Sequence, residues 1–186
     1  MFLANGFETV EALAVLDILR RGGVEVVTVS ITEDEQVVSA QKVVMMADVV
    51  FKDHLVGDDP VPFYGNADAI FLPGGMPGTL NLEANESLKK LIIHYNNSGK
   101  IIAAICAAPS ILGHMGLLRG KKATAYPGFE KDIIGGEYTG SGVEICDNIV
   151  TARGMGKAID QGLALLEILV DKQTADKVGD SVQYLN

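Results

Sequence analysis

Cys106 stands where one apolar segment of the sequence ends and another begins, and a thiol in such a place can act as a nucleophile. Residues 101–105 are apolar without alternation, which is typical of a parallel strand covered on both faces. Pro109 and the apolar residues at helical spacing after it predict a helix. A residue at a strand-to-helix junction lies in a sharp turn that exposes its side chain, provided that its neighbours are small. The small neighbours here are Ala104, Ala107 and Ala108. The pattern predicts that Cys106 is the nucleophile of such a turn, a nucleophile elbow.

A second interpretation of Cys106 stays open at this point, because a lone cysteine is often a small buried hydrophobic residue. The predicted helix favours the functional interpretation. A thiol at a helix N-terminus meets the positive end of the helix dipole and unpaired N–H groups, and both lower its pKa. We therefore expect Cys106 to be a reactive thiolate.

Glu11 is the second residue whose surroundings suggest chemistry. Residues 8–21 predict a helix that ends at Gly22-Gly23 and that is apolar around almost its whole surface. Such a helix is buried on more than one side, as it would be between a sheet and a second subunit. A carboxyl group there loses hydration, so we expect the pKa of Glu11 to rise and the group to hold a proton near neutral pH. The alternative is that Glu8 and Glu11 only favour the helix N-terminus electrostatically, which is the interpretation we adopt for Glu8.

A glycine-rich segment, residues 73–78, follows the buried strand predicted over residues 67–72. Glycines directly after a parallel strand let the backbone turn tightly and point N–H groups into a crevice. Gly74 and Gly75 are therefore candidate donors to an oxyanion or a phosphate, although a plain turn would have the same sequence. The glycines that follow Arg153 precede a predicted helix over residues 157–170, and they are weak evidence for anion binding.

Strand and helix patterns alternate along the chain. Further strands are predicted over 24–31 and 149–151, a hairpin over 36–45, and an amphipathic helix over 87–96. This alternation predicts an α/β layered fold with a mainly parallel sheet, in a single domain over residues 1–186. Active crevices in such sheets lie at the carboxyl ends of the strands. We therefore expect Glu11, the Gly74-Gly75 pair and Cys106 to converge.

The composition excludes several classes of function. A net charge of −9 argues against nucleic-acid binding, and a hydrophobic content of 48% argues against disorder. The longest apolar run, residues 101–108, is too short to span a membrane, and the N-terminus lacks the basic residues of a signal peptide. Two cysteines do not form a disulfide framework, and the three histidines lack metal-ligand spacing. We expect a cytoplasmic protein without a metal.

Several stretches, in this order, resemble the ThiJ/PfpI superfamily, and within it the branch of Parkinson disease protein 7 and its bacterial relatives. They are NGFETVEAL (5–13), LDILRRGG (16–23), FLPGGMPG (71–78), AAICAAP (103–109) and TARGMG (151–156). The resemblance implies a flavodoxin-like three-layer α/β sandwich, a homodimer and no cofactor. It also implies that Cys106 is the nucleophile and that Glu11 is a protonated glutamate that hydrogen-bonds it. The backbone oxyanion site would consist of Gly74, Gly75 and the amide of Ala107.

The sequence departs from the family at informative positions. The human protein of this branch has a histidine where this chain has Tyr126, so Glu11 or Tyr126 would have to handle protons; Tyr126 and Arg153 are candidate pocket residues. The protease-like branch has a histidine where this chain has Ala107, and no His-x-Glu follows as in class I glutamine amidotransferases. Neither of those two activities is expected. The first strand is shorter than the family usually has, which suggests an incomplete N-terminus.

Two functions follow from the resemblance. The first is a cysteine-dependent, cofactor-independent glyoxalase or deglycase that acts on small dicarbonyls such as methylglyoxal or on their adducts, with Cys106 as nucleophile and Glu11 as proton shuttle. The second is an oxidative-stress sensor or protective chaperone in which Cys106 becomes a sulfinic acid. Relatives often carry a label for thiazole monophosphate biosynthesis, but nothing in these residues suggests thiazole chemistry. Whether Glu11 reaches Cys106 decides if either function is chemically possible.

Overall fold

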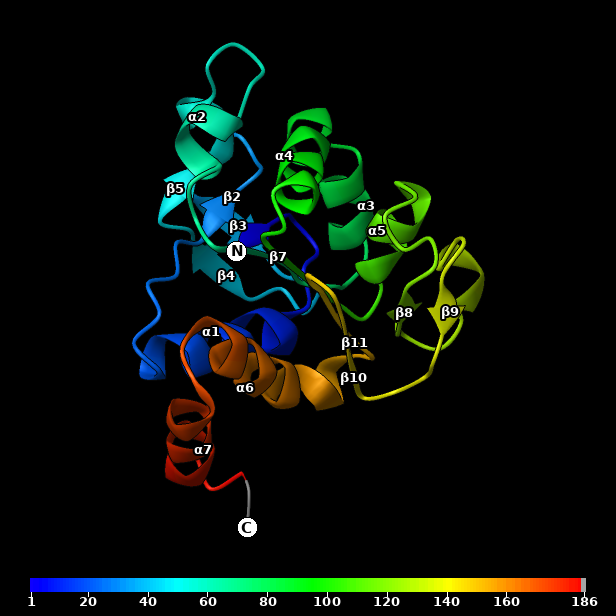
Figure 1. The fold of residues 1–186 in the computed structure, drawn as a ribbon. Helices are drawn as coiled ribbons and strands as arrows, with labels where there is room; N and C mark the ends of the chain where they lie inside the picture. The colour runs from blue at the N-terminus through cyan, green and yellow to red at the C-terminus, as the bar shows by residue number, and fades with distance from the viewer. Residues whose placement is uncertain (185–186) are drawn as a thin grey trace.

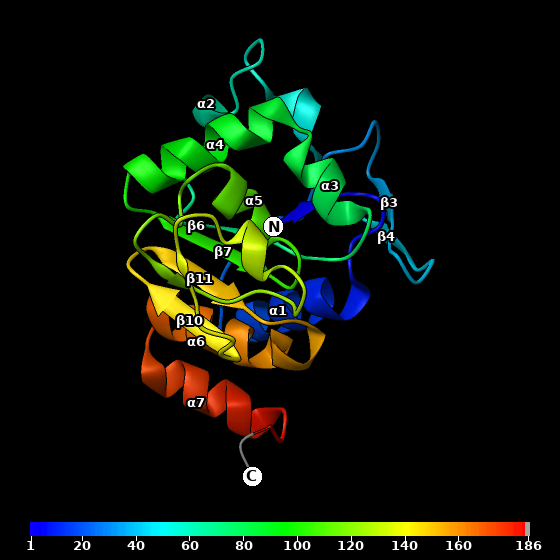
Figure 2. The same ribbon diagram turned by 90° about the vertical axis from the view of Figure 1, so that its right-hand side faces the viewer.

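The computed structural model describes residues 1–184 and places a mainly parallel sheet between two layers of helices (Figures 1 and 2). One part of the sheet has the order β1 (Phe2–Leu3), β2 (Val29–Ser30) and β5 (Val49–Val50), all parallel. The other has the order β10 (Val143–Cys146), β11 (Ile149–Ala152), β7 (Ile101–Ile105) and β6 (Ala69–Leu72). In this second part β10 is antiparallel to β11, and the remaining pairs are parallel. The two parts meet where β1 contacts β6.

Helices cover both faces of the sheet, as Figure 2 shows. One layer consists of α3 (Gly78–Glu83), α4 (Glu86–Asn97) and α5 (Pro109–His114). The opposite layer consists of α1 (Thr9–Arg21) and α6 (Ala158–Leu169), and α7 (Lys172–Ser181) packs on α6. The connections contain the helical turns α2 (Val61–Tyr64), η1 (Phe51–His54), η2 (Glu130–Asp132) and η3 (Met155–Lys157). They also contain the hairpin of β3 (Gln36–Val38) with β4 (Val44–Met46) and the pair of β8 (Lys122–Ala123) with β9 (Glu137–Tyr138).

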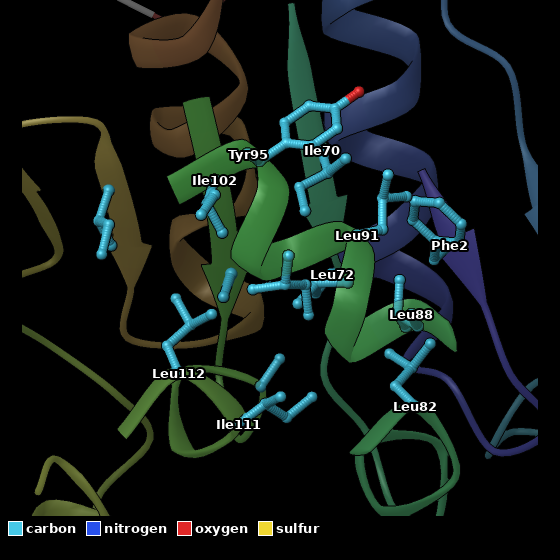
Figure 3. Packing of buried hydrophobic residues seen from close by; sticks show 14 of the residues in the cluster. Phe2, Ile70, Leu72, Leu82, Leu88, Leu91, Tyr95, Ile102, Ile111 and Leu112 are labelled. Atoms are coloured by element: carbon cyan, nitrogen blue, oxygen red, sulfur yellow. The ribbon is translucent and has the colours of Figure 1, made fainter. Parts of the chain in front are cut away.

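The sheet separates two hydrophobic clusters, which explains why its strands are apolar without alternation. Ile102 and Ala104 of β7 belong to the cluster under α4, together with Leu88 and Leu91 (Figure 3). The intervening Ala103 and Ile105 belong to the cluster on the side of α1 and α6. Each fully buried leucine or isoleucine contributes roughly 1.5–3 kcal/mol from apolar burial. The strand that leads to Cys106 is therefore fixed from both sides.

Most of the predicted elements are confirmed, and the exceptions have physical reasons. The strand predicted over 24–31 is wrong in length, since only Val29–Ser30 pairs as a strand. Its neighbour β1 has two residues, and of residues 24–27 only Val27 bonds to that segment, where its carbonyl accepts from the Met1 amine at 2.9 Å. The helix predicted after Cys106 is confirmed as α5, Pro109–His114, whereas α3 was not predicted. Helix α7 was also missed, although its Asp171 cap, which accepts a hydrogen bond from the Thr174 amide at 2.7 Å, is visible in the sequence.

Within residues 1–184, no helix combines the length and the apolar character that crossing a membrane requires.

Candidate active site

Cys106 lies in a strained turn between β7 and α5. Its φ of +64° is in the left-handed region, which costs a non-glycine residue of order 1–3 kcal/mol unless the surroundings enforce it. They do so from two sides here. The Cys106 amide donates to the Ala152 carbonyl of β11 at 2.9 Å, and the Cys106 carbonyl accepts from the Tyr126 amide at 2.8 Å. The turn has the geometry of a nucleophile elbow, with the side chain half-buried.

Glu11 lies on the buried face of α1 and points at this turn. Its side chain is 1% exposed, and its Oε2 accepts a hydrogen bond from the Gly74 amide at 3.0 Å. It also interacts by side-chain hydrogen bonding with Cys106 and with the backbone of Met155. Burial raises the pKa of Glu11 to about 7, against the lowering by these hydrogen bonds. The direction is the one expected from the apolar surround of the helix.

Gly74 lets Glu11 and Cys106 approach each other. A Cβ atom at this position would lie 2.6 Å from the Cys106 Cβ and 2.7 Å from the Glu11 Oε2, both shorter than real contacts allow. The glycine after β6 is therefore a steric requirement of the site. Its amide is already used by Glu11, so it is not free to bind a substrate oxygen.

The thiol of Cys106 differs from the sequence-based expectation. Burial and, after it, the charge and hydrogen bonding of Glu11 raise the pKa of Cys106 to about 12. The amides of Ala107 and Gly75 act in the opposite direction but do not reverse the shift. The expected net lowering of this pKa was wrong, because burial and Glu11 outweigh the lowering by the backbone amides. The helix after the turn begins at Pro109 and has only six residues, so its dipole is small.

Glu11 and Cys106 consequently titrate as one coupled pair. The carboxyl group is the first of the two to ionise, near neutral pH, and the second ionisation is opposed by the charge already present. Near pH 7 the pair carries at most one negative charge, because the first charge opposes the second. Once Glu11 is a carboxylate, it can take the proton of the Cys106 thiol.

The amides of Gly75 and Ala107 both interact with the Cys106 sulfur. Gly75 has a φ of +91°, and a Cβ there would lie 2.4 Å from the Glu8 backbone nitrogen, so only glycine fits this turn. Of the three backbone groups predicted for an oxyanion site, these two lie next to the sulfur, whereas the Gly74 amide is bound to Glu11.

Tyr126 and Arg153, the two predicted pocket residues, have different positions. A Cβ at Gly154 would lie 3.2 Å from Cδ2 of the Tyr126 ring and 4.0 Å from the Cys106 sulfur, so the half-exposed ring borders the site. Arg153 is exposed, and its amide donates to the Gly142 carbonyl at 2.9 Å. A role for its side chain stays a prediction. Gly154 and Met155 also border Glu11 and Cys106. The glycines after Arg153 were the feature of the sequence that pointed to this segment.

Two hollows of the molecule lie away from the site. A hollow of about 350 Å³ is lined by Asn5, Thr32 and Asn81 among others, and one of about 470 Å³ by an acidic segment around Glu33. Cys106 lines neither. Among residues 1–184, no group of three or more histidine, cysteine, aspartate or glutamate side chains is arranged to hold a metal ion.

Comparison with known proteins places this site in a family. Residues 1–168 match the model of the DJ-1/PfpI family. Protein DJ-1 homolog A of Arabidopsis thaliana is 38% identical over 179 residues, which are 95% of this chain and 44% of that protein. The chain thus spans less than half the length of that relative. The Parkinson disease protein 7 homolog of Danio rerio is 29% identical over 96% of this chain and 92% of that protein.

Solved structures agree with these relatives. Oxidized DJ-1 of Toxoplasma gondii superposes with a TM-score of 0.90 at 33% identity, covering 100% of this chain and 97% of that one. DJ-1beta of Drosophila melanogaster superposes with a TM-score of 0.89 at 27% identity, covering 100% and 96%. The likeness confirms the flavodoxin-like fold, and the chain belongs to the DJ-1/PfpI family.

Proposed function

We propose that this protein is a cofactor-independent glyoxalase or deglycase that acts on methylglyoxal-like dicarbonyls or their adducts. One observation carries the proposal: a thiol on a strained turn lies beside a buried carboxyl group with a pKa of about 7, and two backbone amides point at its sulfur. A general base works best when its pKa is close to the operating pH. Glu11 meets that condition at neutral pH.

The raised pKa of Cys106 fits addition to a carbonyl when base and nucleophile act together. As the sulfur bonds to the aldehyde carbon, its proton passes to the Glu11 carboxylate, and the carbonyl π electrons move to the oxygen. The amides of Gly75 and Ala107 would stabilise that oxyanion, an effect of roughly 3 kcal/mol per donor in hydrolases. The product of this step is a hemithioacetal, and no preformed thiolate is needed.

Glu11 would then move a second proton. Glu11 passes the former thiol proton to the oxygen of the hemithioacetal and is a carboxylate again. It then removes the hydrogen from the former aldehyde carbon, and the electron pair forms an enediolate with the neighbouring carbonyl. Return of that proton to the neighbouring carbon, with transfer of the hydroxyl proton from the first oxygen to the second, gives a thioester, which water hydrolyses to the 2-hydroxy acid and the free thiol. The sum is methylglyoxal plus water to lactate, so no redox cofactor is required.

The test is lactate formation from methylglyoxal. We expect Cys106→Ser and Glu11→Gln to reduce kcat/KM at least 100-fold, because each removes a group that acts in bond formation. The matched control is Cys146→Ser, which removes the other thiol, in the β10–β11 hairpin, and should leave the rate unchanged. Equal activity in the wild type, Cys106→Ser and Glu11→Gln would refute the proposal.

We also propose that the chain is a homodimer. On the outer side of α1, Val10 and Leu13 are 47% and 39% exposed, although the helix is apolar nearly all round. A second copy packed on this side would bury them.

A second candidate function is controlled oxidation of Cys106. The observation that favours it is that the similar DJ-1 structure from Toxoplasma gondii is of an oxidized protein. The amides at the sulfur and a protonated Glu11 would donate hydrogen bonds to a sulfinate. Mass spectrometry after mild peroxide treatment tests this. Addition of two oxygens at Cys106 alone supports it, and equal oxidation of Cys146 contradicts it.

A further inference from the structure

His114, the last residue of α5, lies between two carboxylates from other elements. Its Nδ1 is 2.6 Å from Oε1 of Glu83 in α3, and its Nε2 is 3.3 Å from Oδ1 of Asp132 in η2. Ionised carboxylates only accept hydrogen bonds, and a neutral imidazole has one N–H, so it can donate to only one of them at a time. The imidazolium ion donates to both. The geometry is therefore that of protonated His114.

The contact between His114 and Asp132 is supported by a close approach of the backbone. A Cβ atom at Gly113 would lie 1.8 Å from the Asp132 carbonyl oxygen, so only glycine permits this packing of η2 on α5. The Glu83 and Asp132 side chains are 26% and 23% exposed, which partly shields both contacts of the imidazole from water. The structure thus brings Asp132 to the end of α5, where its side chain meets His114.

Backbone hydrogen bonds connect Asp132 to the active site. The Asp132 amide donates to the Phe129 carbonyl at 3.0 Å, and the Phe129 amide donates to the Tyr126 carbonyl at 3.0 Å. The Tyr126 amide in turn donates to the Cys106 carbonyl at 2.8 Å. The Tyr126 ring borders the thiol, since a Cβ at Gly154 would lie 3.2 Å from the ring and 4.0 Å from the sulfur.

The segment 126–132 is consequently held at both ends. At one end Tyr126 is bonded to Cys106, and at the other Asp132 is bonded to His114, which α5 joins to the same turn along the chain. We propose that His114, as an imidazolium ion, is a positioning residue that fixes this segment and holds the Tyr126 ring beside the Cys106 thiol. Its role in turnover rests on the proposed function, whereas its effect on Tyr126 does not.

The position of Tyr126 then depends on pH. Within residues 1–184, the charged groups that act on His114 are Glu83 and Asp132, and hydrogen bonding to Glu83, followed by Asp132, raises its pKa against partial desolvation. Below the pKa of folded His114 both contacts are made. As pH rises through that pKa, one N–H is left, and it stays on Glu83, the closer partner. Asp132 is released, and the segment that leads to Tyr126 loses this anchor on α5.

The experiment is a pH titration of nitrogen-15-labelled protein, followed by NMR between pH 5 and 9. We expect the amide signals of Asp132 and Tyr126 to shift with the same midpoint as the ring signals of His114. In His114→Gln this component should disappear, whereas Glu11, which also titrates near neutral pH, keeps its own effect on Tyr126. In Asp132→Asn the component at Tyr126 should become smaller, because an amide can accept from the charged imidazole and donate to the neutral one.

The rate of Cys106 alkylation by iodoacetamide, measured by mass spectrometry, shows the same effect at the thiol. At pH 5.5 we expect His114→Gln to react about two- to fivefold faster than the wild type, since a partly exposed ion pair no longer holds the Tyr126 ring over the sulfur. At pH 9 the two rates should converge, because the wild type has then lost the contact too. The control His54→Gln, which replaces a histidine stacked on Phe63, should match the wild type at both pH values.

Identical Tyr126 titrations in the wild type and folded His114→Gln overturn the inference, and so does an alkylation ratio that is the same at both pH values, which a purely structural role would give. If His114→Gln does not fold, an Asp132→Asn variant with the full wild-type component at Tyr126 overturns it instead. The lactate assay on the same proteins tests the proposed function separately. A His114-dependent shift of Tyr126 in a wild-type protein that forms no lactate supports the role of His114 and contradicts the glyoxalase. Lactate formation without that shift does the reverse.

Discussion

Replacement of Gly74 by alanine tests the close approach on which the whole site depends. The added Cβ would lie 2.6 Å from the Cys106 Cβ, 2.7 Å from the Glu11 Oε2 and 2.8 Å from the Ile105 carbonyl oxygen. A normal carbon–carbon contact is about 3.5–4.0 Å, so the alanine must push the β7 end and the α1 side chain apart by roughly 1 Å. Overpacking of this kind costs about 1–3 kcal/mol of unfolding free energy.

The activity should fall by more than the loss of stability explains. Misplacing a reacting group by about 1 Å can cost on the order of 100-fold in rate. We therefore expect folded Gly74→Ala to lose about 100-fold in kcat/KM for methylglyoxal, with a Tm lowered by roughly 2–12 °C. Urea unfolding, thermal unfolding and the lactate assay measure these changes on the same sample.

Gly156→Ala is the matched control, because a Cβ at Gly156 would meet no atom within 4 Å. Its stability should stay within about 0.5 kcal/mol of the wild type. A Gly74→Ala variant as stable and as active as this control would refute the steric requirement, since the distances between β6, β7 and α1 would then be larger than the structure gives.

Two further predictions concern the surroundings of the site. His114 lies 2.6 Å from Glu83 and 3.3 Å from Asp132, and hydrogen bonding to Glu83, followed by Asp132, raises its pKa against partial desolvation. Because the folded pKa lies above the unfolded value, the stabilisation is complete below the unfolded pKa of about 6.5 and is lost as pH rises through the folded one. Thermal unfolding at pH 5.5 and 8.5 should show that His114→Gln lowers the Tm more at the lower pH; an equal effect at both contradicts the charged pair. In the second prediction, Leu13→Glu puts a charge on the exposed side of α1 and should convert a dimer to a monomer, as measured by light scattering. The control Glu86→Gln should remain a dimer. If Leu13→Glu has the same mass in solution as the wild type, α1 is not at the interface.

The convergence of the site residues was predictable because it depends on topology. Glu11, Gly74 and Cys106 are far apart in the sequence, but each follows the carboxyl end of a parallel strand. Such strands can be predicted from runs of apolar residues. The burial of Glu11 was also predictable, because its helix has apolar residues on nearly every side. What the sequence does not contain is the distance between such elements. That Gly74 is bound to Glu11 rather than free for a substrate became visible only with the backbone hydrogen bonds.

The direction of the Cys106 pKa and the contact between Glu8 and Gln41 could not be predicted, for a related reason. The sequence places a helix after Cys106, yet whether it begins one or three residues later decides how strongly its dipole acts on the sulfur. The structure has it begin at Pro109 and last six residues. Glu8 and Gln41 lie more than thirty residues apart, and their contact depends on how the β3–β4 hairpin folds over α1. No periodicity in either segment encodes that contact.

The two raised pKa values change which chemistry the site favours. Peroxide is attacked by the thiolate, so oxidation is slow whenever the single negative charge of the pair lies on Glu11 instead of the sulfur. Addition to an aldehyde is different, because the Glu11 carboxylate can take the thiol proton as the sulfur–carbon bond forms. The same pair therefore restrains oxidation while it assists carbonyl addition. Removing the carboxylate in Glu11→Gln should slow the addition to methylglyoxal, and it should also abolish the repulsion that opposes the thiolate. If peroxide oxidation of Cys106 becomes faster in that variant while lactate formation stops, the carboxylate both restrains oxidation and assists carbonyl addition. If both reactions slow together, Glu11 stabilises the thiolate and the inferred order of ionisation is wrong.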